Sequence, residues 1–232
     1  MNENDQIQLA KRYKTPLYVY DGDLMTEKYR ELYKLIQYRP LQILYAMKAN
    51  YNPHILKLLE KEGAWIDAVS PGDVLMAKKC GFSSDRILYT ANNITTEEME
   101  VVVQEDVMFN IGSLSELKRY SDNFRGSQVC LRINPAIVAG ADVKIQTGGD
   151  LTKFGILMTD VEAAMSIAGE FQIKIVGLHK HTGSGIDDKE KFLAAVNNLL
   201  SIAKPELFPD LRFIDLGGGL AVPYRPGEKI ID

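Results

Sequence analysis

The chain has 232 residues, of which 46% are hydrophobic and 25% are charged, and its net charge is -4 at neutral pH. This composition is that of an ordinary globular domain, and it gives no basic face for nucleic acid or for an anionic membrane. No apolar run reaches the ~18 residues that span a bilayer, and the polar N-terminus lacks the apolar core of a secretory signal. Cys80 and Cys130 are too few for a disulfide framework and are expected to be small buried side chains. We therefore expect a cytoplasmic enzyme or binding domain.

Short β-rich runs alternate with amphipathic helical stretches along the chain, and this alternation predicts a parallel sheet. The predicted strands lie within residues 41–47, 64–69, 86–90, 107–111, 128–133, 173–179 and 212–216. The predicted helices lie between them, within residues 53–63, 72–81, 95–106, 113–121, 160–171 and 189–204. A longer insertion, residues 134–155, separates the strand over 128–133 from the helix that follows it.

This order favours a (β/α)8 barrel of the TIM type, because about seven consecutive βα units are more than an open doubly wound sheet usually carries. No eighth strand is visible before Asp232, so we expect the barrel to be incomplete. The β-rich run over 16–21 precedes the barrel and does not fit its rhythm. We therefore predict two parts, an N-terminal segment over residues 1–35 and a barrel domain over residues 36–232.

The functional groups of such barrels lie at the carboxyl ends of the strands and in the loops that follow. Those positions hold one amine, one guanidinium, two imidazoles and two glycine-rich turns, namely Lys48, Arg132, His179, His181, residues 183–185 and residues 217–219. A strand-end lysine that loses part of its hydration can have a lowered pKa and form a Schiff base with an aldehyde. The alternative interpretation is an ordinary lysine that reaches solvent.

The glycine-rich turns can bring backbone N–H groups close to an anion, and phosphate sites in these barrels often use the late loops. The run of Gly217, Gly218 and Gly219 follows an apolar strand, and Ser184 adds a hydroxyl donor to the other turn. A flexible turn that binds no ligand is the alternative.

The two histidines and Arg132 each admit more than one role. His179 and His181 would face the same side of a strand, but no Asp, Glu or Cys lies beside them at metal-ligand spacing, so we predict no metal site. An imidazole packed on a cofactor ring and a structural histidine both stay open. The guanidinium of Arg132 needs an acceptor inside the barrel, which a ligand oxygen or Asp67 would provide equally well.

The same segments resemble the fold-type III pyridoxal-phosphate decarboxylases, and among them most closely the diaminopimelate decarboxylases. The matching motifs run in order along nearly the whole chain: TPLYVYD, ILYAMKAN, DAVSPGDVLMAKKCGF, SLSELKRY, LRINPAI, TGGDLTKFGI, GLHKHTGSGI and DLGGGLAVPY. Each motif is weak alone, whereas the ordered set is specific. The resemblance implies a barrel of the alanine racemase and ornithine decarboxylase type with pyridoxal 5'-phosphate as its cofactor.

The resemblance also implies roles for individual residues. The cofactor-binding set that it implies is Lys48, Asp67, Arg132, His181, Ser184, Gly217, Gly218 and Gly219. Lys48 would hold the cofactor covalently and His181 would stack on its ring, so these two are the implied catalytic residues. Asp67 would lie near the lysine and Arg132 near the ring hydroxyl, while the serine and the glycines would contact the phosphate. Lys153 matches a lysine of the family, and its role stays open.

The implied reaction is the decarboxylation of an amino acid by a homodimer, in the first place meso-diaminopimelate to L-lysine in lysine biosynthesis. Another basic amino acid or a polyamine precursor is an alternative substrate. A non-catalytic relative that binds the cofactor is an alternative function. The single-domain cofactor carriers of similar length would place eight strands in this span, where about seven are predicted.

Several family features are missing from the sequence. A Glu-Pro-Gly-Arg segment that pairs with the pyridine nitrogen, and a C-terminal β domain with a Cys motif and a Tyr, are not found before Asp232. In the family the run over 16–21 is a strand of that β domain, so here it would lack its sheet. We expect residues 1–232 alone to lack decarboxylase activity. An autonomous seven-strand variant, or a domain completed by a second polypeptide, is the alternative.

Overall fold

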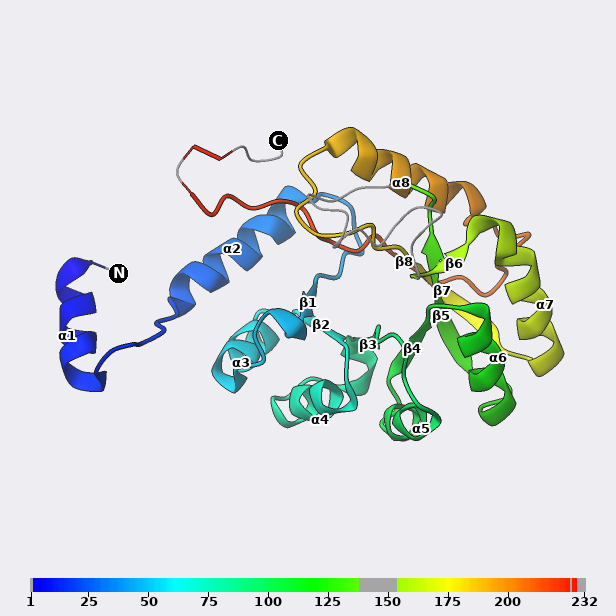
Figure 1. Ribbon diagram of the computed structural model, residues 1–232, viewed down its shortest axis with the longest axis horizontal. Helices are drawn as coiled ribbons and strands as arrows, with labels where there is room; N and C mark the ends of the chain where they lie inside the picture. Colours follow the sequence, from blue (N-terminus) through cyan, green and yellow to red (C-terminus); the bar gives the residue numbers. More distant parts are fainter. Residues whose placement is uncertain (1, 138–153, 226, 229–232) are drawn as a thin grey trace.

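A parallel sheet that curls into an open half-barrel forms the centre of the molecule (Figure 1). The computed structural model describes residues 2–137, 154–225 and 227–228. Neighbouring strands pair in the order β1-β2-β3-β4-β5-β7-β8, and β6 pairs with β5 off this path. The strands are β1 (Leu44–Ala46), β2 (Trp65–Ala68), β3 (Ile87–Tyr89), β4 (Met108–Ile111), β5 (Gln128–Asn134), β6 (Ile156–Leu157), β7 (Lys174–His179) and β8 (Phe213–Asp215).

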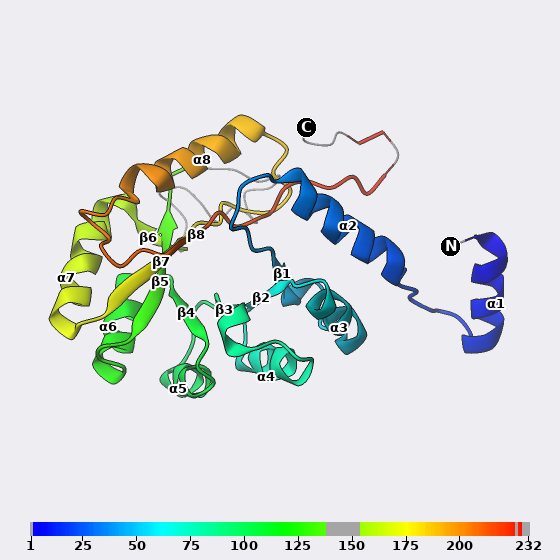
Figure 2. The same cartoon turned by 180° about the vertical axis from the view of Figure 1, so that it is seen from behind.

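Helices cover the outer face of this sheet, as Figures 1 and 2 show from opposite sides. They are α3 (Pro53–Lys61), α4 (Pro71–Lys79), α5 (Thr96–Gln104), α6 (Leu114–Asn123), α7 (Val161–Phe171) and α8 (Lys189–Ile202), with 3-10 turns η1 (Met47–Ala49), η2 (Ser84–Arg86) and η4 (Met158–Asp160). Their apolar faces and the sheet share one core. Within it an aromatic row, Tyr89, Phe109, Tyr120 and Phe124, joins β3 and β4 to α6, with ring centroids 4.9 to 5.1 Å apart.

The predicted strands are all present, and their sequential parallel order confirms the barrel over an open doubly wound sheet. β1 and β8 stand at the two ends of the pairing order, and within the described ranges no strand joins them, so the barrel is incomplete as expected. The short strand β6 was not predicted, because two residues give no alternation to detect. It directly follows the predicted insertion over 134–155, of which residues 138–153, including Lys153, fall outside the described residues.

The N-terminal segment lies outside the strands of the half-barrel. Residues 16–21 form no strand, and in the described part of the chain no strand pairs with them; Tyr18 is 86% exposed. Two unpredicted helices flank this run, α1 (Glu3–Tyr13) and α2 (Gly22–Leu35). The side chains of Asn2 and Asp21 cap their first turns, and neither helix has a fully buried residue. Side-chain caps begin both helices, and Met25 and Tyr29 of α2 pack on the small core cluster of Ile55, Leu59 and Ala64.

Cys80 and Cys130 are both free and buried, which confirms that they serve as small apolar side chains. Burial raises the pKa of the Cys130 thiol well above its ordinary value, so this sulfur stays protonated. Among the helices that the structure describes, none is both long enough and apolar enough to cross a bilayer.

Candidate functional site

Strand register gathers polar side chains into one layer at the carboxyl end of the half-barrel. Arg132 of β5 lies in register with His179 of β7, and His179 lies in register with Asp215 of β8. At the other side Asp67 of β2 is in register with the last residue of β1, next to the turn that carries Lys48. Residues in register lie at the same height in a parallel sheet. The groups that the sequence placed at strand ends therefore do converge.

Lys48 and Asp67 form the β1–β2 side of this layer. Lys48 lies in the 3-10 turn η1 with its side chain exposed, so the structure gives the amine free access but not the loss of hydration considered from the sequence. The half-buried carboxyl of Asp67 accepts a hydrogen bond from the Thr90 hydroxyl. Burial raises the pKa of Asp67 to about 6, and the charges of Lys48 and Arg132 oppose that rise.

Arg132 is buried at the middle of the layer. Its guanidinium donates long hydrogen bonds of 3.4 Å to the Asn92 side chain and to the His181 carbonyl oxygen. The Nε atom has no hydrogen-bond partner within the described residues, and the Phe154 ring centroid lies 4.9 Å from the guanidinium carbon. Asp67 is not among its hydrogen-bond acceptors there, so the pairing with that carboxylate is not formed. Burial lowers the pKa of Arg132 to about 10, which still leaves it charged.

Both histidines of the layer are held as neutral rings. Burial lowers the pKa of His181 to about 3, with the charge of Arg132 adding to the effect. Burial also lowers the pKa of His179 well below its ordinary value, and the Nδ1 atom of His179 is buried with no partner in the part of the chain that the structure describes. A neutral imidazole can lie flat against an aromatic ligand without bringing a charge to it. The described residues contain no group of three or more His, Cys, Asp or Glu placed to hold a metal.

The turn of Gly217, Gly218 and Gly219 is a fixed structure. Gly217 and Gly219 have φ angles of 64° and 90°, which favour glycine. A Cβ on Gly219 would lie 1.8 Å from the carbonyl oxygen of Gly183, whereas one on Gly218 would meet nothing within 4 Å. The N–H of Gly217 donates to the Asp215 carboxylate over 2.7 Å. Backbone contacts thus set the geometry of this turn, and its binding of an anion stays a prediction.

The two glycine-rich turns pack on each other, and the His181 ring lies beside Gly217 and Gly219. A Cβ on Gly217 would lie 3.3 Å from Nδ1 of His181, and one on Gly219 would lie 3.3 Å from its Cε1. The N–H of Ile186 donates to the Gly219 carbonyl oxygen over 2.9 Å and links the turns. Ser184 is exposed on this surface. The structure thus joins His181, Ser184 and the triple glycine, as the sequence led us to expect.

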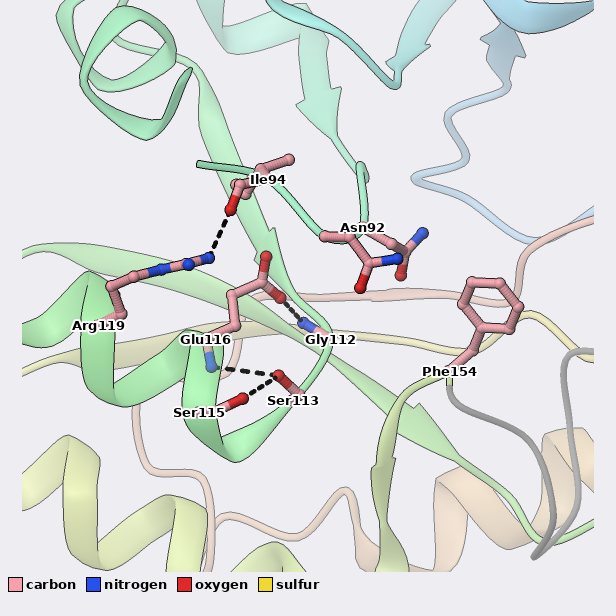
Figure 3. A pocket seen from close by; sticks show the side chains of 9 residues that line it. Asn92, Ile94, Gly112, Ser113, Ser115, Glu116, Arg119 and Phe154 are labelled. Carbon is pink, nitrogen blue, oxygen red and sulfur yellow. Dashed lines mark hydrogen bonds between the residues drawn. The ribbon is translucent and has the colours of Figure 1, made fainter. Parts of the chain in front are cut away.

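A pocket of about 270 Å³ opens beside the layer, between the loops that follow β3 and β4 (Figure 3). Asn92 lines it and also accepts the hydrogen bond from Arg132. Glu116 of α6 also lines it, and one of its carboxylate oxygens accepts a hydrogen bond from the Gly112 N–H over 2.6 Å. Burial raises the pKa of Glu116. No sequence prediction covered this pocket.

A comparison with known protein families identifies the family of this chain. The family model described as the pyridoxal binding domain of pyridoxal-dependent decarboxylases matches residues 23–232. This chain belongs to that family. Its barrel is therefore a pyridoxal-binding domain, and pyridoxal phosphate is the cofactor that the family assigns to it.

Curated relatives in the family are diaminopimelate decarboxylases. That of Methanothermobacter thermautotrophicus is 40% identical over 98% of this chain and 55% of its own length. That of Aquifex aeolicus is 33% identical over 96% of this chain and 54% of its own length. The chain thus spans about half the length of the curated relatives that it matches.

Solved structures of the family superpose on the whole chain. The diaminopimelate decarboxylase of Helicobacter pylori, in complex with L-lysine, has a TM-score of 0.87 at 30% identity and covers 99% of this chain and 59% of its own. A lysine decarboxylase of Selenomonas ruminantium has a TM-score of 0.83 at 24% identity, covering 99% of this chain and 59% of its own, which shows the shared fold.

The residues present fit the family cofactor in three respects. The exposed amine of Lys48 can reach an aldehyde, and the buried guanidinium of Arg132 has a donor that no described residue occupies. The close-packed backbone at Gly217 and Gly219 leaves no room for side chains, which suits a phosphate that approaches main-chain N–H groups.

Sequence reasoning missed four residues that shape this site. The Thr90 hydroxyl donates to Asp67, and the Asn92 side chain accepts from Arg132. The Asp215 carboxylate accepts from the N–H of Gly217, and the Lys180 side chain is fully buried. Thr90 and Asn92 lie in the loop just after β3, and their contacts depend on the spacing between strands. Asp215 could have been found, since it lies near the end of a predicted strand and two residues before Gly217.

Proposed function

We propose that this chain is the cofactor-binding barrel of a pyridoxal-phosphate-dependent amino acid decarboxylase whose substrate is meso-diaminopimelate and whose product is L-lysine. The observation that carries the proposal is the convergence of an exposed amine, a neutral imidazole and a fixed glycine turn on one polar layer. Curated relatives with this reaction in their names at 33–40% identity support the choice of substrate.

Under this proposal, the cofactor would be held by Lys48, Arg132, His181, Ser184 and the turn over 217–219. The amine of Lys48 would hold its aldehyde carbon, and Arg132 would donate to its ring oxygen. Ser184 and the N–H groups of the turn over 217–219 would bind its phosphate. His181 would lie against its ring, where a neutral imidazole adds dispersion and excludes water without a charge.

When bound, pyridoxal phosphate supplies an electron sink for the pair left behind as carbon dioxide departs. The protein supplies position and protons. Lys48 would hold the cofactor aldehyde, and its exposed side chain could move aside for a substrate amine without opening the core. Asp67, with a pKa of about 6, can accept or return a proton close to the Lys48 amine near neutral pH.

Cofactor binding through Lys48 is the first test. The purified chain mixed with pyridoxal phosphate should gain a visible absorption band, and borohydride reduction followed by mass spectrometry should locate the added mass on Lys48. Lys48→Ala should abolish both signals. Lys57→Ala, which removes another exposed lysine outside the site, is the matched control and should keep them. Retention of the band in Lys48→Ala would contradict the assignment.

Turnover is the second test. We expect residues 1–232 to bind the cofactor without releasing carbon dioxide, because β1 and β8 remain unpaired in the described structure. Release would be measured with meso-diaminopimelate, lysine, ornithine and arginine. Turnover of any of them by the isolated chain would show that the half-barrel suffices and would name its substrate. The homodimer and the cytoplasmic location stay predictions, and light scattering would test the dimer.

A further inference from the structure

The carboxyl group of Asp67 has one oxygen that is held and one that is free. Its Oδ1 atom accepts a hydrogen bond from the hydroxyl of Thr90. Among the described residues, no donor forms a hydrogen bond with Oδ2. The side chain is half-buried near the end of β2. A carboxylate that loses part of its hydration depends on the donors that the protein supplies, so this single hydroxyl matters to its charge and its direction.

Thr90 is itself held in place by the sheet. It directly follows β3 and is 8% exposed. Its N–H donates to the carbonyl oxygen of Ala68 over 2.8 Å, which continues the pairing of Ala68 with Tyr89 between β2 and β3. A β-branched side chain has few χ1 rotamers, so a fixed backbone also fixes its hydroxyl. The donor to Asp67 is therefore tied to the residue that follows Asp67 in the chain.

The charged groups that face Asp67 come from three other parts of the barrel. Lys48 of η1 and Arg132 of β5 favour the ionised carboxylate, whereas Asp215 of β8 disfavours it. Burial is the largest influence and raises the pKa of Asp67 to about 6. Of the influences that lower this pKa, the hydrogen bond from Thr90 is the largest. A neutral hydroxyl in direct contact thus has more effect than either cation.

We propose that Thr90 is a positioning residue for Asp67: its hydroxyl holds the carboxyl group by Oδ1 and favours the ionised form, which leaves Oδ2 available to a group bound at Lys48. A hydrogen bond to an ionised carboxylate is stronger than one to a neutral carboxyl group. Strand register sets Asp67 beside the last residue of β1, two positions before Lys48. The inference rests on the proposed function in that Lys48 holds the cofactor aldehyde.

The first test uses the protein without cofactor. The carboxyl ¹³C resonance of Asp67, assigned by its loss in Asp67→Asn, should titrate about one pH unit higher in Thr90→Val than in the wild type. Valine has nearly the same shape as threonine but no hydroxyl. Thr90→Ser keeps the hydroxyl and should titrate like the wild type. An unchanged titration in Thr90→Val, or an equal rise in Thr90→Ser, would overturn the proposal.

Thr182→Val is the matched control for that test. Thr182 is also fully buried, but its hydroxyl has no hydrogen-bond partner in the described part of the chain. Its replacement should leave the Asp67 titration where it is. An equal rise in Thr182→Val would mean that any loss of a buried hydroxyl has this effect, which would also overturn the proposal. Thr90→Ala takes the place of Thr90→Val if the valine variant does not fold.

The second test measures the same effect through folding. A carboxyl group whose pKa is raised in the folded state makes the protein lose stability as the pH rises from the ordinary to the raised value. In Thr90→Val the free energy of unfolding should therefore keep falling for about one pH unit beyond the point where that of the wild type levels off. In an Asp67→Asn background, Thr90→Val should leave the pH dependence unchanged. The same change in both backgrounds would show that Thr90 does not act through Asp67.

The third test asks whether the effect reaches the cofactor. The nitrogen that links Lys48 to a bound aldehyde can carry a proton, and an ionised carboxylate nearby favours that charge. The pH midpoint of the visible band should therefore be lower in Asp67→Asn than in the wild type. It should also be lower, by a smaller amount, in Thr90→Val, with Thr90→Ser at the wild-type midpoint. A midpoint that Thr90→Val leaves unchanged would overturn the positioning role.

Failure of the inference is distinguishable from failure of the proposed function. A wild-type chain that binds no pyridoxal phosphate would contradict the proposed function, and the Asp67 titration in the free protein would still decide whether Thr90 controls this carboxyl group. A wild-type chain that binds the cofactor, together with an Asp67 titration that Thr90→Val does not move, would leave the function standing and reject Thr90 alone.

Discussion

On the β1–β2 side of the polar layer, Lys48 is exposed on a 3-10 turn and Asp67 is only half-buried. On the β7–β8 side, Gly217 and Gly219 are fixed by backbone contacts, with a fully buried lysine beneath them. Under the proposed function, the two sides have different roles. A residue that must exchange its bond with each substrate needs access, whereas a phosphate anchor that stays in place benefits from a preorganised cradle. The contrast predicts that substitutions on the glycine side damage the fold and the cofactor affinity together.

Gly219→Ala should have the largest effect. The added Cβ would stand 1.8 Å from the Gly183 carbonyl oxygen, at a φ of 90° that side chains rarely adopt. We expect a loss of about 3 kcal/mol in the free energy of unfolding and no measurable cofactor binding. Gly218→Ala, next to it, meets no atom within 4 Å and should keep both properties. Urea unfolding and absorption titration would measure the pair, and equal behaviour would show that the turn is not held as described.

Asp67→Asn should have the next largest effect, on the pH dependence of stability. Burial raises the pKa of Asp67 to about 6 from the ordinary value of 3.8. Between these values the folded state binds more protons than the unfolded state, so the wild type loses stability as the pH rises through that window. The amide variant has no such titration. Between pH 4 and pH 7, we expect the free energy of unfolding of Asp67→Asn to rise by about 2 kcal/mol relative to that of the wild type, measured by urea unfolding. Parallel pH curves would contradict the buried-carboxyl environment.

The smallest of the three effects concerns the histidines. His181 lies against the glycine turn, whereas His179 is buried within the β7–β8 wall. His181→Ala should weaken pyridoxal phosphate binding by about tenfold more than His179→Ala does, because only the former removes a ring from the proposed cofactor face. The affinities would come from absorption titration of the two variants. The reverse order would place the cofactor ring on the other imidazole.

Strand-end positions made most of this site predictable from the sequence. Lys48, Arg132, His181 and the glycine run all lie at or just after the ends of predicted strands, and a parallel barrel brings such positions to one end. The predicted strands appear for the same reason, since a buried strand leaves a continuous apolar signal. What the pattern could not supply is which side chains face each other across neighbouring strands. The hydrogen bond from Arg132 to Asn92 depends on loop geometry that no local pattern records.

The helices outside the core were the least predictable part of the fold. α1 and α2 bury no residue fully, and the N-caps at Asn2 and Asp21 are their clearest signals in the sequence, although Met25 and Tyr29 of α2 pack on a core cluster. The run over 16–21 has β-rich composition and was expected to lack its sheet, and it has no partner strand in the described structure.

The long hydrogen bond from Arg132 to the His181 carbonyl oxygen makes the two ends of the site thermodynamically dependent on each other. A ligand atom that engages the guanidinium competes with that carbonyl, and the same segment carries the ring that rests on the glycine turn. Linkage is reciprocal, so a ligand at the turn that changes affinity at Arg132 by some factor has its own affinity changed by the same factor when Arg132 is occupied. A ligand that carries both a ring oxygen and a phosphate would therefore bind cooperatively within a single molecule, and its two halves given separately would not add up to its affinity.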